Sequence, residues 1–227
     1  MKTFLNLTII TFFSFFCTLS THAHYPKVSW HTGKIILNDK NQLEGEIAYN
    51  WLAEMVMIRQ TSGRMSTLSA DQVLQFGWFD YNQHTYRNFL SLPASATENT
   101  LHHAFFEVCM DGPLSVVRRL KQRRGLFKRA FGHPSNYTDQ PAMAQNTDHF
   151  DYYVHDAGRL LPMARFYTEV YERLMAAYDQ PLQRYVQTHN INSRVLAGQL
   201  VLVDHYNFLV QQDARTASAK SYESAPN

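Results

Sequence analysis

The sequence predicts an α+β protein, in which an antiparallel, twisted sheet or partial β-barrel is followed by a C-terminal helical cap. From Gly33 to Leu92, apolar and polar residues alternate, which is the period of strands with one buried face. After Arg165, apolar residues recur at i, i+4, which is the period of an amphipathic helix. Of the 227 residues, 45% are hydrophobic and 18% charged, which excludes collagen-like, coiled-coil and wholly disordered chains.

The first 23 residues have the pattern of a signal peptide. Lys2 supplies the positive charge, an apolar run follows from Phe4 to Phe16, and Thr21-His22-Ala23 ends in small residues that signal peptidase accepts. A membrane anchor needs about 20 apolar residues, and this run is shorter and interrupted. A lipoprotein signal at Cys17 is disfavoured because Phe16 stands where such signals have a small residue. The sequence therefore predicts cleavage after Ala23.

The expected mature protein has 204 of the 227 residues, and the loss of Lys2 lowers the net charge from +2 to +1. Its only cysteine is Cys109, so no disulfide within the chain is expected. No other stretch is long and apolar enough to span a membrane. These features predict an exported protein that is periplasmic, outer-membrane-associated or extracellular.

Residues 24–163 are expected to form a β-rich domain built from hairpins. Turn residues separate paired apolar runs at five places: Asn38–Gln42, Thr61–Gly63, Asp80–Asn82, Asp111–Pro113 and Asp156–Gly158. The small, polar stretch Pro93–Thr100 reads as a linker. Residues 129–149 have two prolines and no apolar period, which indicates a long, disordered loop.

The helical region is expected over residues 164–210. Phe166, Val170, Leu174 and Tyr178 have i, i+4 spacing and define one face of a first helix. Pro181 suits the first turn of a second helix that ends near Asn190, and a third helix is expected from about Arg194 to Val210. Residues 211–227 lack apolar spacing and are predicted to be a disordered tail.

Several segments together resemble secreted β-rich proteins of unknown function from Bacteroidota. They are the runs Gly33–Leu37 and Leu43–Tyr49, Gln72–Asp80, Phe105–Val108 before Asp111–Leu114, and Tyr152–His155. The resemblance extends over most of the mature chain, including the helical end. It implies a location in the cell envelope and a β-rich body, and it brings no catalytic residues.

The strongest local anomaly is a run of basic residues. Seven of the 21 Lys and Arg residues fall within twelve positions that contain no acid: Arg118, Arg119, Lys121, Arg123, Arg124, Lys128 and Arg129. Such a segment can neutralise phosphates of lipid head groups, lipopolysaccharide or nucleic acid. The alternative is a solvated hairpin tip whose charges discourage aggregation. The signal peptide argues against nucleic acid, so an anionic envelope surface is the candidate partner, with another envelope protein as the alternative.

Metal binding and catalysis find little support in the sequence. His102 and His103 are adjacent in an expected strand and point to opposite faces, while His149, Asp151 and His155 match no zinc-binding spacing. Glu44 and Glu46 share a strand face, as glutamates on the solvent side of any hairpin do. The sequence therefore predicts no cofactor, no metal and no catalytic residue.

The predicted function is a noncatalytic, envelope-associated or periplasmic binding or structural module. The alternative is a hydrolase that acts on envelope or extracellular polymers. A cleft in which Glu44, Glu46, Asp80, Glu107 or the histidines converge would favour the hydrolase.

Overall fold

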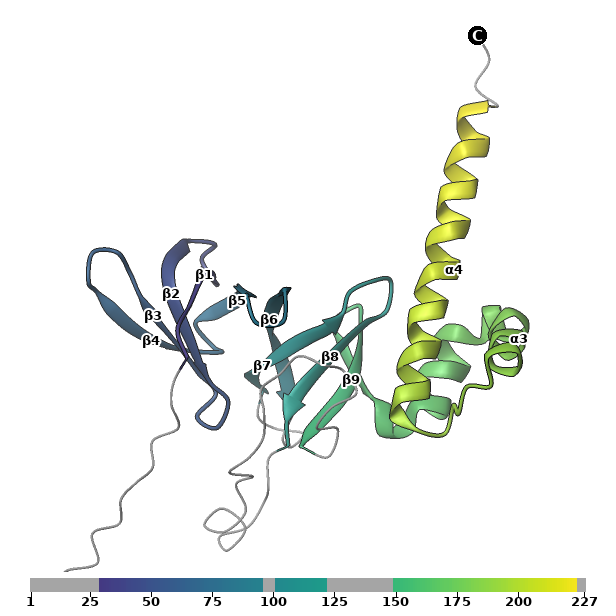
Figure 1. Ribbon diagram of the computed structural model, residues 1–227, viewed down its shortest axis with the longest axis horizontal. Coiled ribbons are helices and arrows are strands. Elements are labelled where there is room, and N and C mark those ends of the chain that lie inside the picture. The colour runs from purple at the N-terminus through teal and green to yellow at the C-terminus, as the bar shows by residue number, and fades with distance from the viewer. Residues whose placement is uncertain (1–28, 96–100, 122–148, 224–227) are drawn as a thin grey trace, which may run out of the picture.

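The computed structural model describes residues 29–95, 101–121 and 149–223 (Figure 1). Ten strands form one antiparallel sheet in the order β10-β9-β8-β7-β6-β5-β1-β2-β3-β4, and helices follow it. The α+β prediction is confirmed. The strands are β1 His31–Leu37, β2 Gln42–Asn50, β3 Met55–Arg59, β4 Met65–Ser69, β5 Val73–Asp80, β6 Thr85–Ser95, β7 Leu101–Met110, β8 Ser115–Leu120, β9 Phe150–Asp156 and β10 Arg159–Pro162.

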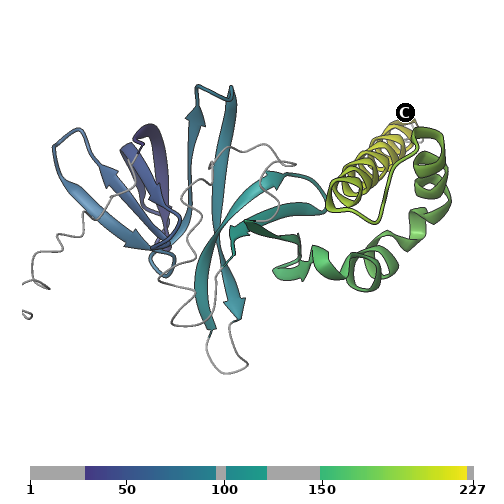
Figure 2. The same ribbon diagram turned by 60° about the horizontal axis from the view of Figure 1, so that its bottom comes forward.

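The sheet is open but strongly curled, so strands that are distant in the sheet order approach each other across its inner face (Figures 1 and 2). The ring of Tyr49 in β2 lies 5.7 Å from that of Phe105 in β7. Trp51, in the turn after β2, lies 5.3 Å from Phe150 of β9. Aromatic side chains fill the space between these strands, and the apolar surface that they bury stabilises the curl.

The expected linker at Pro93–Thr100 begins later than the sequence indicates. β6 continues to Ser95, and Pro93 pairs with His103 of β7. Pairing between two strands fixes this backbone even though the residues are small and polar. The remainder, residues 96–100, lies outside the described residues.

The first helical segment is not the single α-helix that the sequence predicts. It consists of a 3-10 turn η1 (Met163–Arg165), a π-helix η2 (Phe166–Met175) and a second 3-10 turn η3 (Ala176–Tyr178). A π-helix has more residues per turn, so residues at i, i+5 share the buried face in addition to those at i, i+4. The buried side chains are Phe166, Val170, Tyr171 and Met175, and Leu174 is only half-buried.

Two α-helices complete the chain, α3 (Asp179–His189) and α4 (Leu196–Glu223). α3 ends where Asn190 adopts a left-handed conformation with φ of 50°. α4 continues well past Val210, which corrects the expected disordered tail: residues 211–223 are helical, and the side chains of 211–218 are exposed. Figure 1 shows this end of α4 projecting beyond the rest of the molecule. Among the described residues, no helix combines the length and apolarity needed to cross a bilayer.

A polar clamp joins α4 to the turn between β7 and β8. The Asn207 side chain accepts a hydrogen bond from the Leu114 N–H and donates one to the Leu114 carbonyl, both at 2.9 Å. Asn207 and Leu114 are both buried. A side chain at Gly112 would lie 2.6 Å from the Asn207 amide nitrogen, so the turn needs glycine there to admit the clamp.

Candidate functional site

The densest group of charges is an ionic row on the inner face of the sheet, made of Asp80, Arg87, Glu107 and Arg118. These residues come from β5, β6, β7 and β8, which are consecutive in the sheet. Glu107 lies directly opposite Arg118 in the register, and Phe89, two residues from Arg87, lies opposite Glu107. Period-two alternation therefore places these side chains on the same face as the aromatic core.

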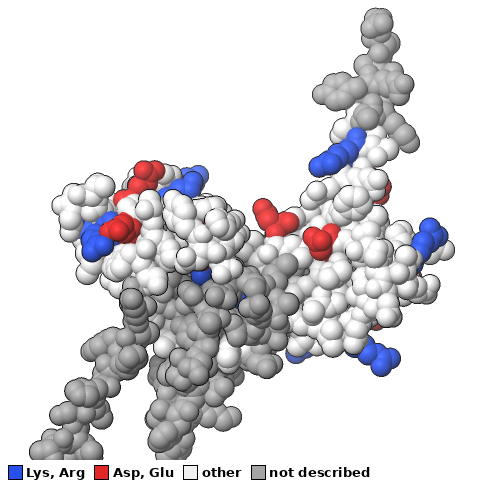
Figure 3. All heavy atoms as spheres, viewed as in Figure 1, with Lys and Arg blue, Asp and Glu red and all other residues white. Residues whose placement is uncertain are grey.

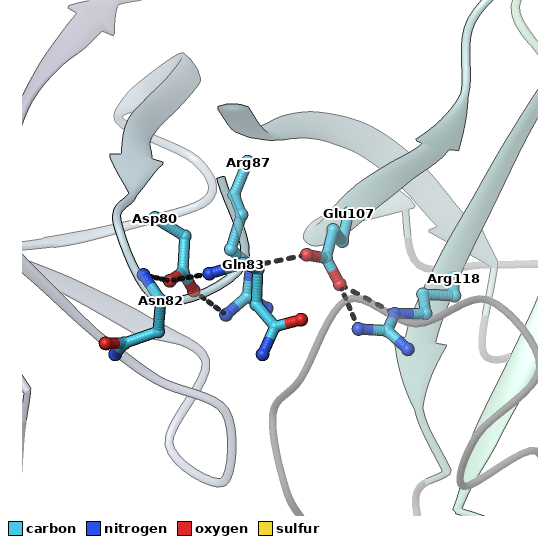
Figure 4. Close-up of polar contacts among 6 residues, drawn as sticks. All are labelled: Asp80, Asn82, Gln83, Arg87, Glu107 and Arg118. Carbon is cyan, nitrogen blue, oxygen red and sulfur yellow. Dashed lines mark hydrogen bonds and ion pairs between the residues drawn. The ribbon is translucent and has the colours of Figure 1, made fainter. Parts of the chain in front are cut away.

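Glu107 is the centre of the row, because its carboxylate contacts two arginines (Figure 4). One oxygen accepts a hydrogen bond from Arg87 Nε at 2.7 Å, and the other accepts one from Arg118 Nε at 2.6 Å. Arg87 Nη1 also lies 4.0 Å from Asp80, whose other oxygen accepts bonds from the N–H groups of Asn82 and Gln83. Each carboxylate in the row is thus held by groups of the protein itself.

The row is almost fully removed from solvent: Glu107 is 1% exposed and Arg118 is 0% exposed. The guanidinium of Arg118 lies 4.3 Å from the centre of the Phe150 ring, and that of Arg87 lies 5.3 Å from the Trp78 ring. Burial by itself lowers the pKa of Arg118, but the Glu107 carboxylate, Cys109 and a hydrogen bond with Tyr152 together outweigh this effect, and the net pKa is raised. The arginine therefore keeps its charge inside the core.

This arrangement is suited to structure and not to acid–base catalysis. A general acid or base must reach a substrate and change its protonation state during the reaction. Asp80 and Glu107 converge, as the hydrolase alternative requires, but they do so inside the core with arginines as partners. Glu44 and Glu46 lie elsewhere, exposed on β2, where Glu46 pairs with Arg59.

The structure divides the basic run that the sequence singles out. Arg118 is the buried member of the ionic row, which corrects its assignment to the surface. Arg119 donates two hydrogen bonds to Glu54, at 2.6 and 2.8 Å. Lys121 is exposed just after the end of β8. Arg123, Arg124, Lys128 and Arg129 lie outside the described residues.

On the face drawn in Figure 3, the described residues form no surface patch in which one charge is as concentrated as it is in the sequence of the basic run. Lys and Arg side chains alternate there with Asp and Glu side chains around the β1–β4 end. We call the part of the basic run that follows Arg119 the basic segment: Lys121, Arg123, Arg124, Lys128 and Arg129.

The histidines and the cysteine contribute no reactive group in the described ranges. No cluster of three or more His, Cys, Asp or Glu side chains there could hold a metal ion. His103 contacts Asp71, with Nδ1 3.5 Å from the carboxylate. The pKa of the Cys109 thiol is raised, first by burial and then by the nearby Glu107 carboxylate, so the thiol stays protonated.

A cavity of about 350 Å³ lies where β9 and β10 meet the start of α4. We call it the α4 cavity. Its lining combines apolar, aromatic and charged side chains: Lys121, Phe150, Asp151, Tyr152, Tyr153, Pro162, Met163, Ala164, Arg194, Leu196 and Gln199. The volume falls in the range typical of small-molecule sites.

The sequence contained a signal for part of the ionic row. Arg118 alternates in step with the apolar residues Val116 and Leu120, and Glu107 lies two residues from Phe105. The period-two pattern of a strand therefore places both charged side chains on the same face as apolar residues. The contribution of Arg194 and Gln199 to the α4 cavity had no such signal, because it depends on how α4 packs against β9.

Comparisons with protein-family models, with curated proteins and with solved structures found no match. The function must therefore be argued from the residues themselves.

Proposed function

We propose that this chain is an exported, noncatalytic binding module that associates with an anionic envelope surface through its basic segment. The observation that carries the proposal is the division of the basic run. Arg118 and Arg119 already have carboxylate partners within the protein, Glu107 and Glu54. From Lys121 to Arg129 the sequence contains five cations and no acid, so their charges add along a short stretch.

The partners of four described acids are consistent with a noncatalytic role. Asp80 and Glu107 are neutralised in the core, and Glu46 and Glu54 have arginine partners. A hydrolase of the kind considered above needs a carboxyl group that is both accessible and free to change its charge. No specific observation favours that alternative.

Export is part of the same proposal, and it rests on the charged, apolar and small-residue regions of residues 1–23. Mass spectrometry of protein isolated from its own cells should find a mature chain that begins at His24. An intact Met1 on membrane-embedded protein would contradict export as a processed chain.

The binding test compares two variants with equal loss of charge. In the first, Arg123, Arg124, Lys128 and Arg129 are replaced by Gln. In the second, four exposed arginines outside the basic segment are replaced by Gln: Arg64, Arg173, Arg184 and Arg215. Each cation near an anionic membrane contributes roughly 1 kcal/mol, so the first variant should lose most of its binding, whereas the control should keep most of it.

The measurement is co-sedimentation with anionic vesicles and with lipopolysaccharide at low and high salt. Binding of the wild type should fall as salt rises, because the attraction is screened. Absence of wild-type binding, or equal losses in both variants, would contradict the proposal. Retained binding to zwitterionic vesicles would also count against it, since charge would then not be the cause.

A further inference from the structure

The α4 cavity has the composition of a binding site that discriminates charge. Two cations, Lys121 and Arg194, line it together with one acid, Asp151. The formal charges of these lining residues therefore sum to +1, and the other lining residues are uncharged. An anion would be attracted into a space of this kind, with its apolar part directed at the floor.

The most informative polar lining residue is Gln199, which is 9% exposed. The backbone N–H of Gln199 bonds to the Val195 carbonyl in the helix. Gln199 lines the cavity together with Arg194 and Leu196. An amide at the border of a cavity can donate a hydrogen bond to a ligand oxygen.

The start of α4 adds to the same side of the cavity. Leu196 lines the cavity and is the first residue of α4, so the positive end of the helix dipole lies at this side, although the Gln199 N–H is already bonded to Val195. The loop before the helix lies tightly over Gly198, since a side chain there would meet the Asn192 carbonyl oxygen. Asn192 in turn accepts a hydrogen bond from the Arg194 N–H at 3.1 Å, which fixes the loop that carries Arg194.

The floor of the cavity is apolar and rigid. Phe150 is 1% exposed and Met163 is 3% exposed, and both belong to the main core. Leu196 packs against that core from α4. A short hydrocarbon or ring could bury its surface here while its charged end remained beside Arg194.

We propose that the α4 cavity binds a small amphiphile with an oxyanion head, either a phosphate or a carboxylate. Arg194 and Lys121 attract the head, the Gln199 amide donates a hydrogen bond to it, and Phe150, Met163 and Leu196 contact the apolar part. The proposal goes beyond surface association, because a soluble molecule can occupy the cavity whether or not the basic segment binds a membrane. Asp151 opposes the anion and limits its affinity.

Isothermal titration and amide-detected NMR of the mature chain can test this with hexyl phosphate and hexanoate. Hexanol and inorganic phosphate are the controls for the apolar part and for the head. Hexyl phosphate should bind at least tenfold more tightly than either control. If hexanoate binds as well as hexyl phosphate, the head is a general oxyanion, and if it binds tenfold more weakly, the site prefers phosphate.

Three single substitutions assign the binding to this cavity. Arg194→Gln should weaken binding of hexyl phosphate about tenfold, while Arg184→Gln, on the exposed surface of α3, should leave it unchanged. Gln199→Met preserves the side-chain length and should weaken binding several-fold. Asp151→Asn should strengthen binding several-fold, which a merely destabilised protein would not do.

The variant with four substitutions at Arg123, Arg124, Lys128 and Arg129 separates this proposal from the surface proposal. It should lose vesicle binding and keep hexyl phosphate binding. No heat or shift changes with hexyl phosphate in the folded wild type would overturn the cavity proposal. An equal response of Arg194→Gln and Arg184→Gln would overturn it as well.

Discussion

The ionic row and the Asn207 clamp both bury polar groups, and they satisfy these groups with different chemistry. The inner face of the sheet buries the ionic row, in which Glu107 holds two arginines. The junction of sheet and helix buries a neutral clamp, in which Asn207 bonds both backbone groups of Leu114. The ionic row must overcome a much larger desolvation cost than the clamp. Removing one partner should therefore be far more damaging in the sheet than at the junction.

Glu107→Gln tests the ionic row and should have the largest effect. It keeps the side-chain shape but leaves Arg87 and Arg118 buried without a full countercharge, so the free energy of unfolding should fall by about 3–5 kcal/mol. Urea unfolding measures this, with the exposed Glu172→Gln as the control. A loss below about 1 kcal/mol would show that water reaches the row.

Replacing all three central members of the ionic row by apolar residues tests whether desolvation of their charges is the main cost. In Arg87→Met, Glu107→Leu and Arg118→Met together, no charge remains to be desolvated. The triple variant should recover most or all of the stability that Glu107→Gln loses, because a well-packed apolar set is often as stable as a buried ion pair. If the triple variant is less stable than Glu107→Gln, the arginines contribute mainly through packing on the aromatic rings.

Asn207→Leu tests the clamp and should have an intermediate effect. It leaves the Leu114 N–H and carbonyl buried without their partner, which should cost about 2–3 kcal/mol. Gln212→Leu, on the exposed end of α4, is the control and should change little. Protection of α4 amides from hydrogen exchange should fall in Asn207→Leu while protection in β5 and β6 persists. Uniform loss across both regions would mean that helix and sheet unfold as one unit.

Glu54→Gln should have a smaller effect, of about 1 kcal/mol. Glu54 accepts two hydrogen bonds from Arg119, but both side chains are partly exposed, so water compensates for much of the loss. Thermal unfolding can measure this difference, and the effect should shrink in high salt. If Glu54→Gln lost as much stability as Glu107→Gln, the Glu54–Arg119 pair would have to be shielded from water as strongly as the ionic row.

A separate effect is expected at alkaline pH in the helical region. Burial, and then the hydrogen bond to Asp179, raise the pKa of Tyr171 from 10.0 to about 12. The folded protein therefore keeps this proton while the unfolded chain loses it, so stability should decrease as pH rises from 10 to 12. Tyr171→Phe should flatten this part of the stability profile. If the stability of Tyr171→Phe fell with pH as steeply as that of the wild type, the decrease would be due to other tyrosines.

The strand region was largely predictable, because it depends on short patterns that the sequence displays directly. Asp111–Pro113 and Asp156–Gly158 mark turns, and the runs around them pair as expected in β7–β8 and β9–β10. The role of Glu107 was harder to predict, because its partners come from two other strands. A carboxylate in a strand has the same local pattern whether it meets water or two arginines.

The helical region was less predictable for a physical reason. The i, i+4 spacing of Phe166, Val170 and Leu174 favours an α-helix, but the structure has a π-helix in which Tyr171 and Met175 are buried instead of Leu174. The buried residues of the π-helix belong to the same apolar core as residues of the sheet. The extension of α4 beyond Val210 also lacked a signal, because its exposed end has few apolar residues to indicate a periodic face.

The position of Glu107 also has a consequence for how the chain assembles. Its two arginine partners come from strands on either side of β7, at sequence separations of 20 and 11 residues. If either neighbour paired one residue out of step, its guanidinium would turn to the opposite face and the carboxylate would lose half of its countercharge. Misaligned pairings of β6, β7 and β8 are thus penalised more strongly than apolar contacts alone could achieve. Glu107 therefore favours the native alignment of β6, β7 and β8 over alignments that are shifted by one residue.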